Sequence, residues 1–177
     1  MSEPEFSTDQ VEAIVEHTYN NMGFFVRDTE VTPEFSAKYQ PGLIFREKGV
    51  TYASNRIGGP TANHRFAIFS NHMMKKDPDP QNYGLCLATK GSVFKVIGRH
   101  DHEKGSWIVL LHLLGENYWK VFQDFNSPVD DGMVRSCVDL LSEQANKPPI
   151  PELLAEEWVD SCKYPMGLDE RGEFFPL

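Results

Sequence analysis

The sequence predicts a single α+β domain that spans residues 1–177. Three observations predict this class: helical spacing of apolar residues near the start, a long middle part of short apolar runs separated by tight turns, and a return to helical spacing in the last third. Helices and strands do not alternate one by one, as they do in a doubly wound nucleotide-binding fold. We therefore expect an antiparallel meander sheet of about six or seven strands, with one N-terminal helix and two C-terminal helices.

The N-terminal helix is predicted from about Ser7 to Met22. Ser7 and Gln10 have the spacing of a capping box, in which each side chain binds the backbone N–H of the other residue. Gly23 follows the last apolar position and is typical of a residue that ends a helix. The polar residues 1–6 precede this helix and are expected to be disordered, and they do not resemble a signal peptide.

Short apolar runs between residues 43 and 125 are predicted as strands. The turns at 46–49 and 89–92 each contain a glycine, so the runs on either side of each turn are expected to pair as hairpins. The run Trp107–Leu113 is apolar at nearly every position, which predicts a central strand covered on both faces. The predicted strands are 43–45, 50–53, 66–69, 83–88, 93–97, 107–113 and 118–125.

Two helices are predicted after the strands. Ser127 is a suitable N-cap, Pro128 suits the first helical position, and Asp130 favours the positive end of a helix. The second helix is expected from about Pro151 to Ser161, after a stiff proline-rich break. Residues 165–177 show neither helical nor strand spacing and are expected to form an irregular tail.

Charge is distributed unevenly along this acidic chain. The net charge is −9 and the isoelectric point about 5.1. Residues 56–104 carry a net charge of +4, whereas residues 1–55 carry −5 and residues 124–177 carry −8. The total favours a protein partner and argues against a general nucleic-acid binder, although the basic middle part leaves a cationic surface open. No apolar run is long enough for a membrane span, and the sequence leaves a homo-oligomer open.

The cysteines and the known catalytic motifs limit the chemistry that the sequence predicts. Cys86, Cys137 and Cys162 are too few and too scattered for a disulfide framework, which predicts a cytoplasmic protein. The sequence contains no nucleophile elbow, HExxH motif or phosphate-binding loop. We therefore predict no cofactor, no metal ligand and no catalytic residue. A nucleophilic Cys86 is the less favoured alternative, because a small buried hydrophobic residue explains that position just as well.

The candidate ligand-binding residues lie in the basic middle part of the chain: Arg65, Arg99, His100 and His102. Since His100 and His102 are two residues apart, both side chains point to the same side of an extended segment. With a histidine from another strand they have the chemistry of a zinc site, but Arg99 and Lys104 beside them disfavour a cation. The four side chains are therefore candidates for contacts with a phosphate or carboxylate group.

The function that the sequence favours is a small cytoplasmic interaction protein without catalytic activity. The small size, the acidity and the lack of an assembled catalytic motif are typical of an adaptor, a chaperone-like protein or an inhibitor or immunity-type binder. Two alternatives stay open. One is a hydrolase or small-ligand-binding protein that uses the basic, histidine-rich segment, and the other is a self-associating structural module.

Overall fold

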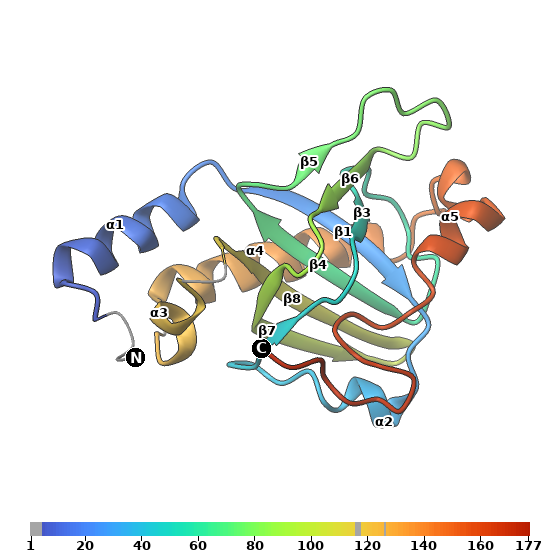
Figure 1. Ribbon diagram of the computed structural model, residues 1–177. Helices are drawn as coiled ribbons and strands as arrows, with labels where there is room; N and C mark the ends of the chain where they lie inside the picture. Colours follow the sequence, from blue (N-terminus) through green and yellow to red (C-terminus); the bar gives the residue numbers. More distant parts are fainter. Residues whose placement is uncertain (1–4, 116–117, 126) are drawn as a thin grey trace.

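A computed structural model describes residues 5–115, 118–125 and 127–177 (Figure 1). A single twisted sheet runs through the molecule, with α1 extending from one end and α5 lying at the other. The helices and strands in chain order are α1 (Thr8–Tyr19), β1 (Gly23–Thr29), α2 (Pro33–Ser36), β2 (Ile44–Arg46), β3 (Thr51–Ser54), β4 (His64–Ser70), β5 (Met74–Lys75), β6 (Leu85–Ala88), β7 (Val93–His102), β8 (Gly105–Leu113), α3 (Trp119–Gln123), α4 (Pro128–Gln144), the 3₁₀ helix η2 (Pro151–Leu154) and α5 (Glu156–Ser161).

The sheet is mixed, so the predicted antiparallel meander is wrong. Its eight strands have the order β2-β7-β8-β4-β1-β3-β6-β5, and β4 runs parallel to β8 with Ile68 opposite Leu110. The other neighbouring strands described are antiparallel. Short turns do not decide which strands become partners. Since β5, β6 and β7 lie between β4 and β8 in the chain, the connection is long enough for a parallel crossover.

The two predicted hairpins are also wrong. β2 pairs with β7, whereas β3 pairs with β1 and β6, so the turn at 46–49 connects strands in different parts of the sheet. The turn at 89–92 likewise connects β6 and β7, which are not neighbours. The central position of β8 is confirmed, because it lies between β7 and β4 and is buried from Ser106 to Leu113.

The long helices have the predicted caps. Ser7 and Gln10 form a capping box at the start of α1, and Ser127 and Asp130 form one at the start of α4. The described residues contain five α-helices rather than three, because α2 follows Thr32 and the predicted strand 118–125 contains α3. The second C-terminal helix is divided into η2 and α5 at Ala155, which has an extended backbone.

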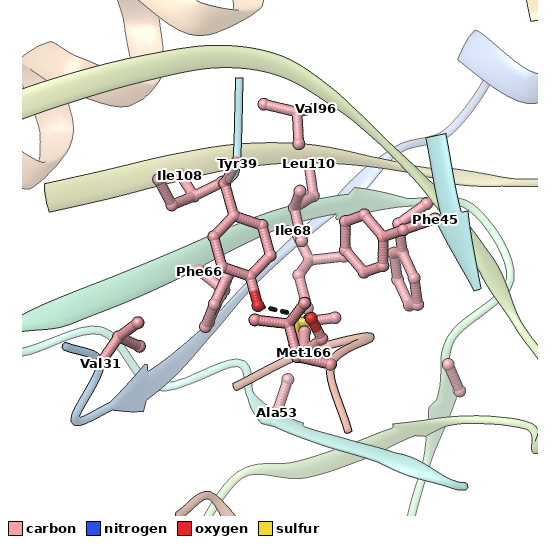
Figure 2. Packing of buried hydrophobic residues seen from close by; sticks show 13 residues of the cluster. Val31, Tyr39, Phe45, Ala53, Phe66, Ile68, Val96, Ile108, Leu110 and Met166 are labelled. Carbon is pink, nitrogen blue, oxygen red and sulfur yellow. Dashed lines mark hydrogen bonds between the residues drawn. The ribbon is translucent and has the colours of Figure 1, made fainter. Parts of the chain in front are cut away.

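The core lies on both faces of the sheet. On one face, Phe66, Ile108 and Leu110 pack with Tyr39, Phe45 and Met166, all of them at most 1% exposed (Figure 2). On the other face, Cys137 and Leu141 of α4 cover Val26, Ala67 and Val109. Each face is therefore closed by a segment from the last third of the chain.

The predicted irregular tail contributes to the first of these cores. Met166 is fully buried, and the Tyr39 hydroxyl donates to its carbonyl oxygen at 2.5 Å. Isolated bridges join Leu168 to Phe174 and Arg46 to Phe175. Residues 161–168, which we call the strap, thus pack against the sheet. Of the predicted disordered residues 1–6, residues 1–4 lie outside the described residues. In the part of the chain that is described, no helix has the length and apolarity needed to cross a membrane.

Candidate functional site

A cavity lies beside the β7–β8 hairpin, against the C-terminal end of α4. Its volume is about 690 Å³, within the range of small-molecule sites. Two of the four predicted ligand-binding residues, Arg65 and His102, line it. We call this cavity the hairpin pocket; its lining residues are Glu30, Pro60, Thr61, Ala62, Asn63, Arg65, His102, Glu103, Lys104, Trp107, Ser142, Ala145, Asn146 and Lys147.

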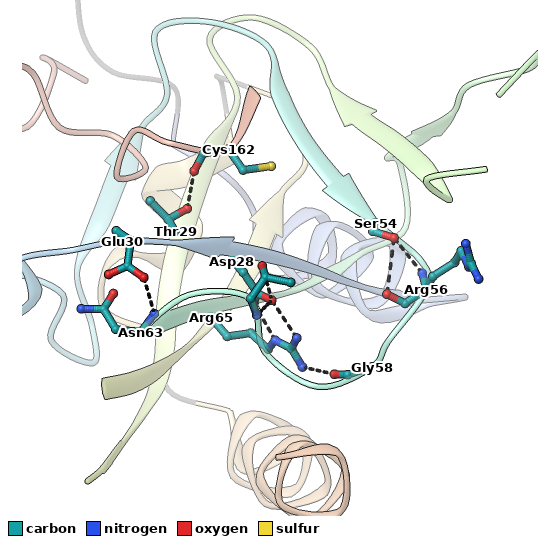
Figure 3. Close-up of polar contacts among 10 residues, drawn as sticks. Asp28, Thr29, Glu30, Ser54, Arg56, Gly58, Asn63, Arg65 and Cys162 are labelled. Atoms are coloured by element: carbon teal, nitrogen blue, oxygen red, sulfur yellow. Dashed lines mark hydrogen bonds and ion pairs between the residues drawn. The ribbon is translucent and has the colours of Figure 1, made fainter. Parts of the chain in front are cut away.

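Arg65 is the buried lining residue that we call the floor of the hairpin pocket, and it forms an ion pair with Asp28 (Figure 3). Arg65 Nε and Nη2 donate to the two carboxylate oxygens of Asp28, at 2.6 and 2.8 Å. The same groups hold the neighbouring loop, because Arg65 Nη1 donates to the Gly58 carbonyl and the backbone N–H of Thr61 donates to Asp28 Oδ2. Since Asp28 neutralises Arg65, the guanidinium fixes the floor of the pocket and is not a free cation.

Aromatic rings form one wall. Trp107 lies opposite His100 across the hairpin, and their ring centroids are 5.0 Å apart with an interplanar angle of 23°. His102 also lies 5.0 Å from the Trp107 ring. The expectation that His100 and His102 point to the same side is confirmed by these shared contacts. The rings of His102 and Trp107 thus give this part of the pocket an aromatic lining.

His102 carries the clearest unused polar group of the pocket. Its Nδ1 accepts the backbone N–H of Lys104 at 3.3 Å, so the proton of the neutral ring lies on Nε2. Nε2 is buried and has no hydrogen-bond partner within the described residues. Burial lowers the pKa of His102, and the charge of His100 lowers it further. The ring of His102 is therefore neutral near pH 7, and its buried Nε2–H lacks an acceptor within the described residues.

The rim carries exposed groups of both signs. Lys104 and Lys147 supply ammonium groups, while Glu30 and Glu103 supply carboxylates. Glu30 also accepts the backbone N–H of Asn63 at 3.2 Å. This mixture of charges can contact a ligand that has both anionic and hydroxyl groups.

Two glycines allow the backbone segments around the pocket to approach each other. A Cβ atom on Gly59 would lie 1.8 Å from the Lys147 carbonyl oxygen, and one on Gly105 would lie 1.5 Å from the Asn63 carbonyl oxygen. The loop before β4 therefore contacts the segment after α4 on one side and the hairpin on the other, which fixes the width of the pocket.

Arg99 lies on the opposite face of the sheet, because it pairs with Ile108 while His100 pairs with Trp107. Its Nη1 donates to the carbonyl oxygens of Ser36 and Tyr39, at 2.5 and 3.2 Å. Arg99 thus anchors the segment around α2. The structure does not bring Arg99 into the pocket. His100 does not line the pocket either, but its ring stacks on Trp107, which does.

The remaining histidines of the middle part lie elsewhere. The Nε2 atom of His64 is 2.5 Å from Ser36 Oγ, and His72 stacks on His112 at 3.8 Å. No group of three or more potential metal ligands occurs among the residues that the structure describes. Burial raises the pKa of the Cys86 thiol, which makes Cys86 a weak nucleophile.

Sequence reasoning missed Asp28, and it favoured Trp107 as a core residue rather than as part of a ligand pocket. A two-residue turn at Glu103 and Lys104 would have placed Trp107 opposite His100, so hairpin register was the available signal for Trp107. Asp28 lies opposite Arg65 on an antiparallel neighbour whose register the sequence does not reveal.

No protein family and no curated protein matches the sequence. Solved structures with partial similarity include bacterial effectors and toxins. The type III effector XopAI of Xanthomonas axonopodis pv. citri has a TM-score of 0.47 at 16% identity, over 54% of this chain and 43% of that one. The ADP-ribosyltransferase HopU1 of Pseudomonas syringae pv. Tomato DC3000 has a TM-score of 0.45 at 14% identity, over 52% and 45%. This chain thus spans less than half the length of either.

Exoenzyme S of Pseudomonas aeruginosa, solved with human 14-3-3 protein beta and carba-NAD, is similar over 73% of this chain and 69% of its own, with a TM-score of 0.43 and 15% identity. The prediction of an interaction protein without catalytic activity is contradicted by the comparisons, because HopU1 and Vis are described as ADP-ribosyltransferases, which are enzymes.

Proposed function

We propose that this chain is an enzyme that binds a nucleotide in the hairpin pocket, and that it transfers the ADP-ribosyl group when the nucleotide is NAD. The observation that carries the proposal is one cavity of about 690 Å³ that is lined by the rings of His102 and Trp107 and by charged groups of both signs. A nucleotide presents a flat base for stacking and phosphate oxygens that accept hydrogen bonds.

Each part of the pocket has a role in this proposal. The rings of His102 and Trp107 provide the surface on which a base stacks. The ammonium groups of Lys104 and Lys147 provide donors for phosphate oxygens. The carboxylates of Glu30 and Glu103 provide acceptors for ribose hydroxyls. Asp28 and Arg65 hold the floor.

The transfer step breaks the bond between ribose C1′ and the nicotinamide nitrogen, and nicotinamide leaves with the bonding electron pair. C1′ then bonds to an oxygen or nitrogen of the acceptor, which loses a proton. Glu30 and Glu103 are the carboxylates at the rim that can take this proton. A protein is the acceptor that we favour, consistent with the expectation of a protein partner.

The test combines binding and turnover. Calorimetry of the full chain with NAD, ADP-ribose and ATP measures affinity, and chromatography of released nicotinamide measures reaction. We expect His102→Ala to weaken NAD binding about tenfold, which corresponds to about 1.4 kcal/mol. We expect Lys104→Ala, which removes an ammonium group from the rim, to weaken NAD binding as well. Lys90→Ala, which removes an exposed lysine outside the hairpin pocket, is its matched control and should leave affinity unchanged.

Two outcomes would contradict the proposal. Nucleotides that fail to bind at about 1 mM would exclude the pocket as a nucleotide site. Binding that is retained without nicotinamide release, in the presence of a mixture of candidate protein acceptors, would exclude ADP-ribosyl transfer as the reaction.

A cytoplasmic location also remains part of this proposal. Cys86, Cys137 and Cys162 are free thiols, and all three are buried. Free thiols persist most readily in a reducing compartment. Mass spectrometry of the three thiols after exposure to air tests whether the protein tolerates an oxidising compartment.

A further inference from the structure

Three exposed apolar side chains lie on the η2–α5 segment or directly after it, outside the hairpin pocket. Leu154 is 54% exposed, Val159 46% and Tyr164 65%. They are three of the seven large hydrophobic residues that are exposed among the described residues, and they lie within one short stretch of chain. Such a concentration is typical of a surface that binds another molecule.

The inner side of the same segment is anchored firmly. Trp158 and Leu153 are 4% and 7% exposed, and the Trp158 ring lies 5.1 Å from the ring of Tyr83. Figure 1 places α5 at the end of the molecule opposite α1. The exposed side chains are therefore presented from a fixed support at the periphery, which lowers the entropy lost when a partner binds.

Carboxylates surround the apolar side chains. Glu156, Glu157 and Asp160 are exposed on α5, against the single ammonium of Lys163 that follows it. The Lys163 Nζ atom lies 5.2 Å above the centre of the Tyr164 ring. The surface thus already holds a cation against an aromatic face, the arrangement that lysine and arginine side chains of a partner would use.

We propose that this surface, which we call the α5 face, binds a basic amphipathic segment of another protein. Leu154 and Val159 would contact the apolar side of that segment, and its lysine or arginine side chains would contact Glu156, Asp160 and the Tyr164 ring. The charge complementarity makes the association depend on salt, because exposed charges are screened within about 10 Å at 0.1 M ionic strength.

The probe is a fluorescein-labelled amphipathic helix of leucine and lysine, of about 16 residues, titrated with the full chain at about 50 mM salt. We expect Val159→Ser to raise the Kd about fivefold and Glu156→Lys/Asp160→Lys to raise it at least about tenfold. Two matched controls carry the same changes elsewhere: Val50→Ser, at a valine that is 41% exposed, and Glu12→Lys/Glu16→Lys on α1. The controls should bind within about twofold of the unchanged protein.

The outcomes distinguish binding at the α5 face from attraction by net charge and from self-association. Equal losses in the α5 and α1 charge variants would mean that net charge alone attracts the peptide, and would overturn the proposal. Failure of the unchanged protein to bind the peptide would also overturn it. Light scattering that shows a dimer abolished by Val159→Ser would assign the face to a second copy instead. Because NAD binding is measured separately, failure here leaves the hairpin pocket untouched.

Discussion

Arg27 and Arg65 are buried on neighbouring strands of one sheet, but their charges are compensated in different ways. Arg65 is 3% exposed and binds the carboxylate of Asp28 through two hydrogen bonds. Arg27 is 6% exposed and forms no ion pair within the described residues. Its guanidinium donates to the carbonyl oxygens of Tyr52, Ser161 and Tyr164, at distances of 3.0–3.2 Å.

The two arrangements stabilise different parts of the molecule. Arg27 and Asp28 are consecutive on β1, so they point to opposite faces. Asp28 and Arg65 fix the loop at 58–61, which is close to Arg65 in sequence. Arg27 instead holds the strap, which is more than 130 residues away in the chain. We infer that the floor of the hairpin pocket resists local opening. The strap is held less strongly, because its hydrogen bonds with Arg27 use uncharged carbonyl oxygens as acceptors.

Asp28→Ala tests the stronger arrangement and should have the largest effect. It leaves the Arg65 guanidinium buried without a carboxylate, so we expect the free energy of unfolding to fall by about 3–5 kcal/mol. Urea denaturation measures this change. Thr61→Val is the comparison, because it removes only the hydroxyl bond to Asp28 and should cost about 1 kcal/mol. Similar losses in the two variants would contradict the importance of the ion pair.

Arg27→Ala tests the weaker arrangement. Three carbonyl oxygens lose a charged donor, and we expect a loss of about 2–3 kcal/mol. Cys162 lies in the strap and Cys137 in α4, both 1% exposed, so their reaction with a thiol reagent reports the opening of each region. The variant should speed modification of Cys162 about tenfold more than that of Cys137. Equal acceleration of both would indicate global unfolding rather than release of the strap.

His112 shows a third way of burying a polar side chain, because it is buried as a neutral group. Lowering the pH tests this arrangement. Burial lowers the pKa of His112 to about 3, and His72 stacked on it adds to this effect. The unfolded state, with a pKa of about 6.5, binds the proton first, so stability is full above that pH and is lost as the pH falls toward 3. This residue alone predicts a loss of about 2 kcal/mol by pH 5. His112→Gln, which keeps an acceptor for Ser70, should flatten the pH dependence measured by thermal unfolding.

Replacement of Arg65 or Arg27 by lysine should have the smallest effects on stability and should separate the two arginines most clearly. Arg65→Lys cannot reproduce the two parallel bonds to Asp28 and should cost about 1–2 kcal/mol. Arg27→Lys keeps a charged donor for separate carbonyl oxygens and should cost less than about 1 kcal/mol. Chemical denaturation of both variants under the same conditions measures the two losses in the free energy of unfolding. A larger loss for Arg27→Lys than for Arg65→Lys would contradict the different roles of the two arginines.

Local signals in the sequence predicted local structure well. The capping box at Ser7 and the N-cap at Ser127 depend on residues within one turn, and both formed as expected. Strand pairing depends on contacts between distant segments. The lengths of the turns therefore could not predict that β4 pairs with β8 in parallel. The stretch 118–125 was mistaken for a strand because its aromatic residues suit either structure, and Phe122 is buried on a helix instead.

The candidate site was predicted only in part, for the same reason. His102 lines the hairpin pocket and Arg65 forms its floor, but Arg99 points to the other face because strand alternation separates it from His100. The positive charge of the middle part did not predict a cationic surface at Arg65, since Asp28 from the acidic first part of the chain neutralises it. Charge counted along the chain cannot reveal such pairs between strands.

The close contacts at Gly59 and Gly105 have a consequence for how this protein can diverge. Any side chain at either position would displace the backbone of Lys147 or Asn63, so substitution there cannot be accommodated by a rotamer change. The charged residues at the rim face solvent and are free to drift without such a constraint. A pattern that keeps both glycines and a histidine–tryptophan pair across the hairpin is therefore a better guide to distant relatives than overall identity.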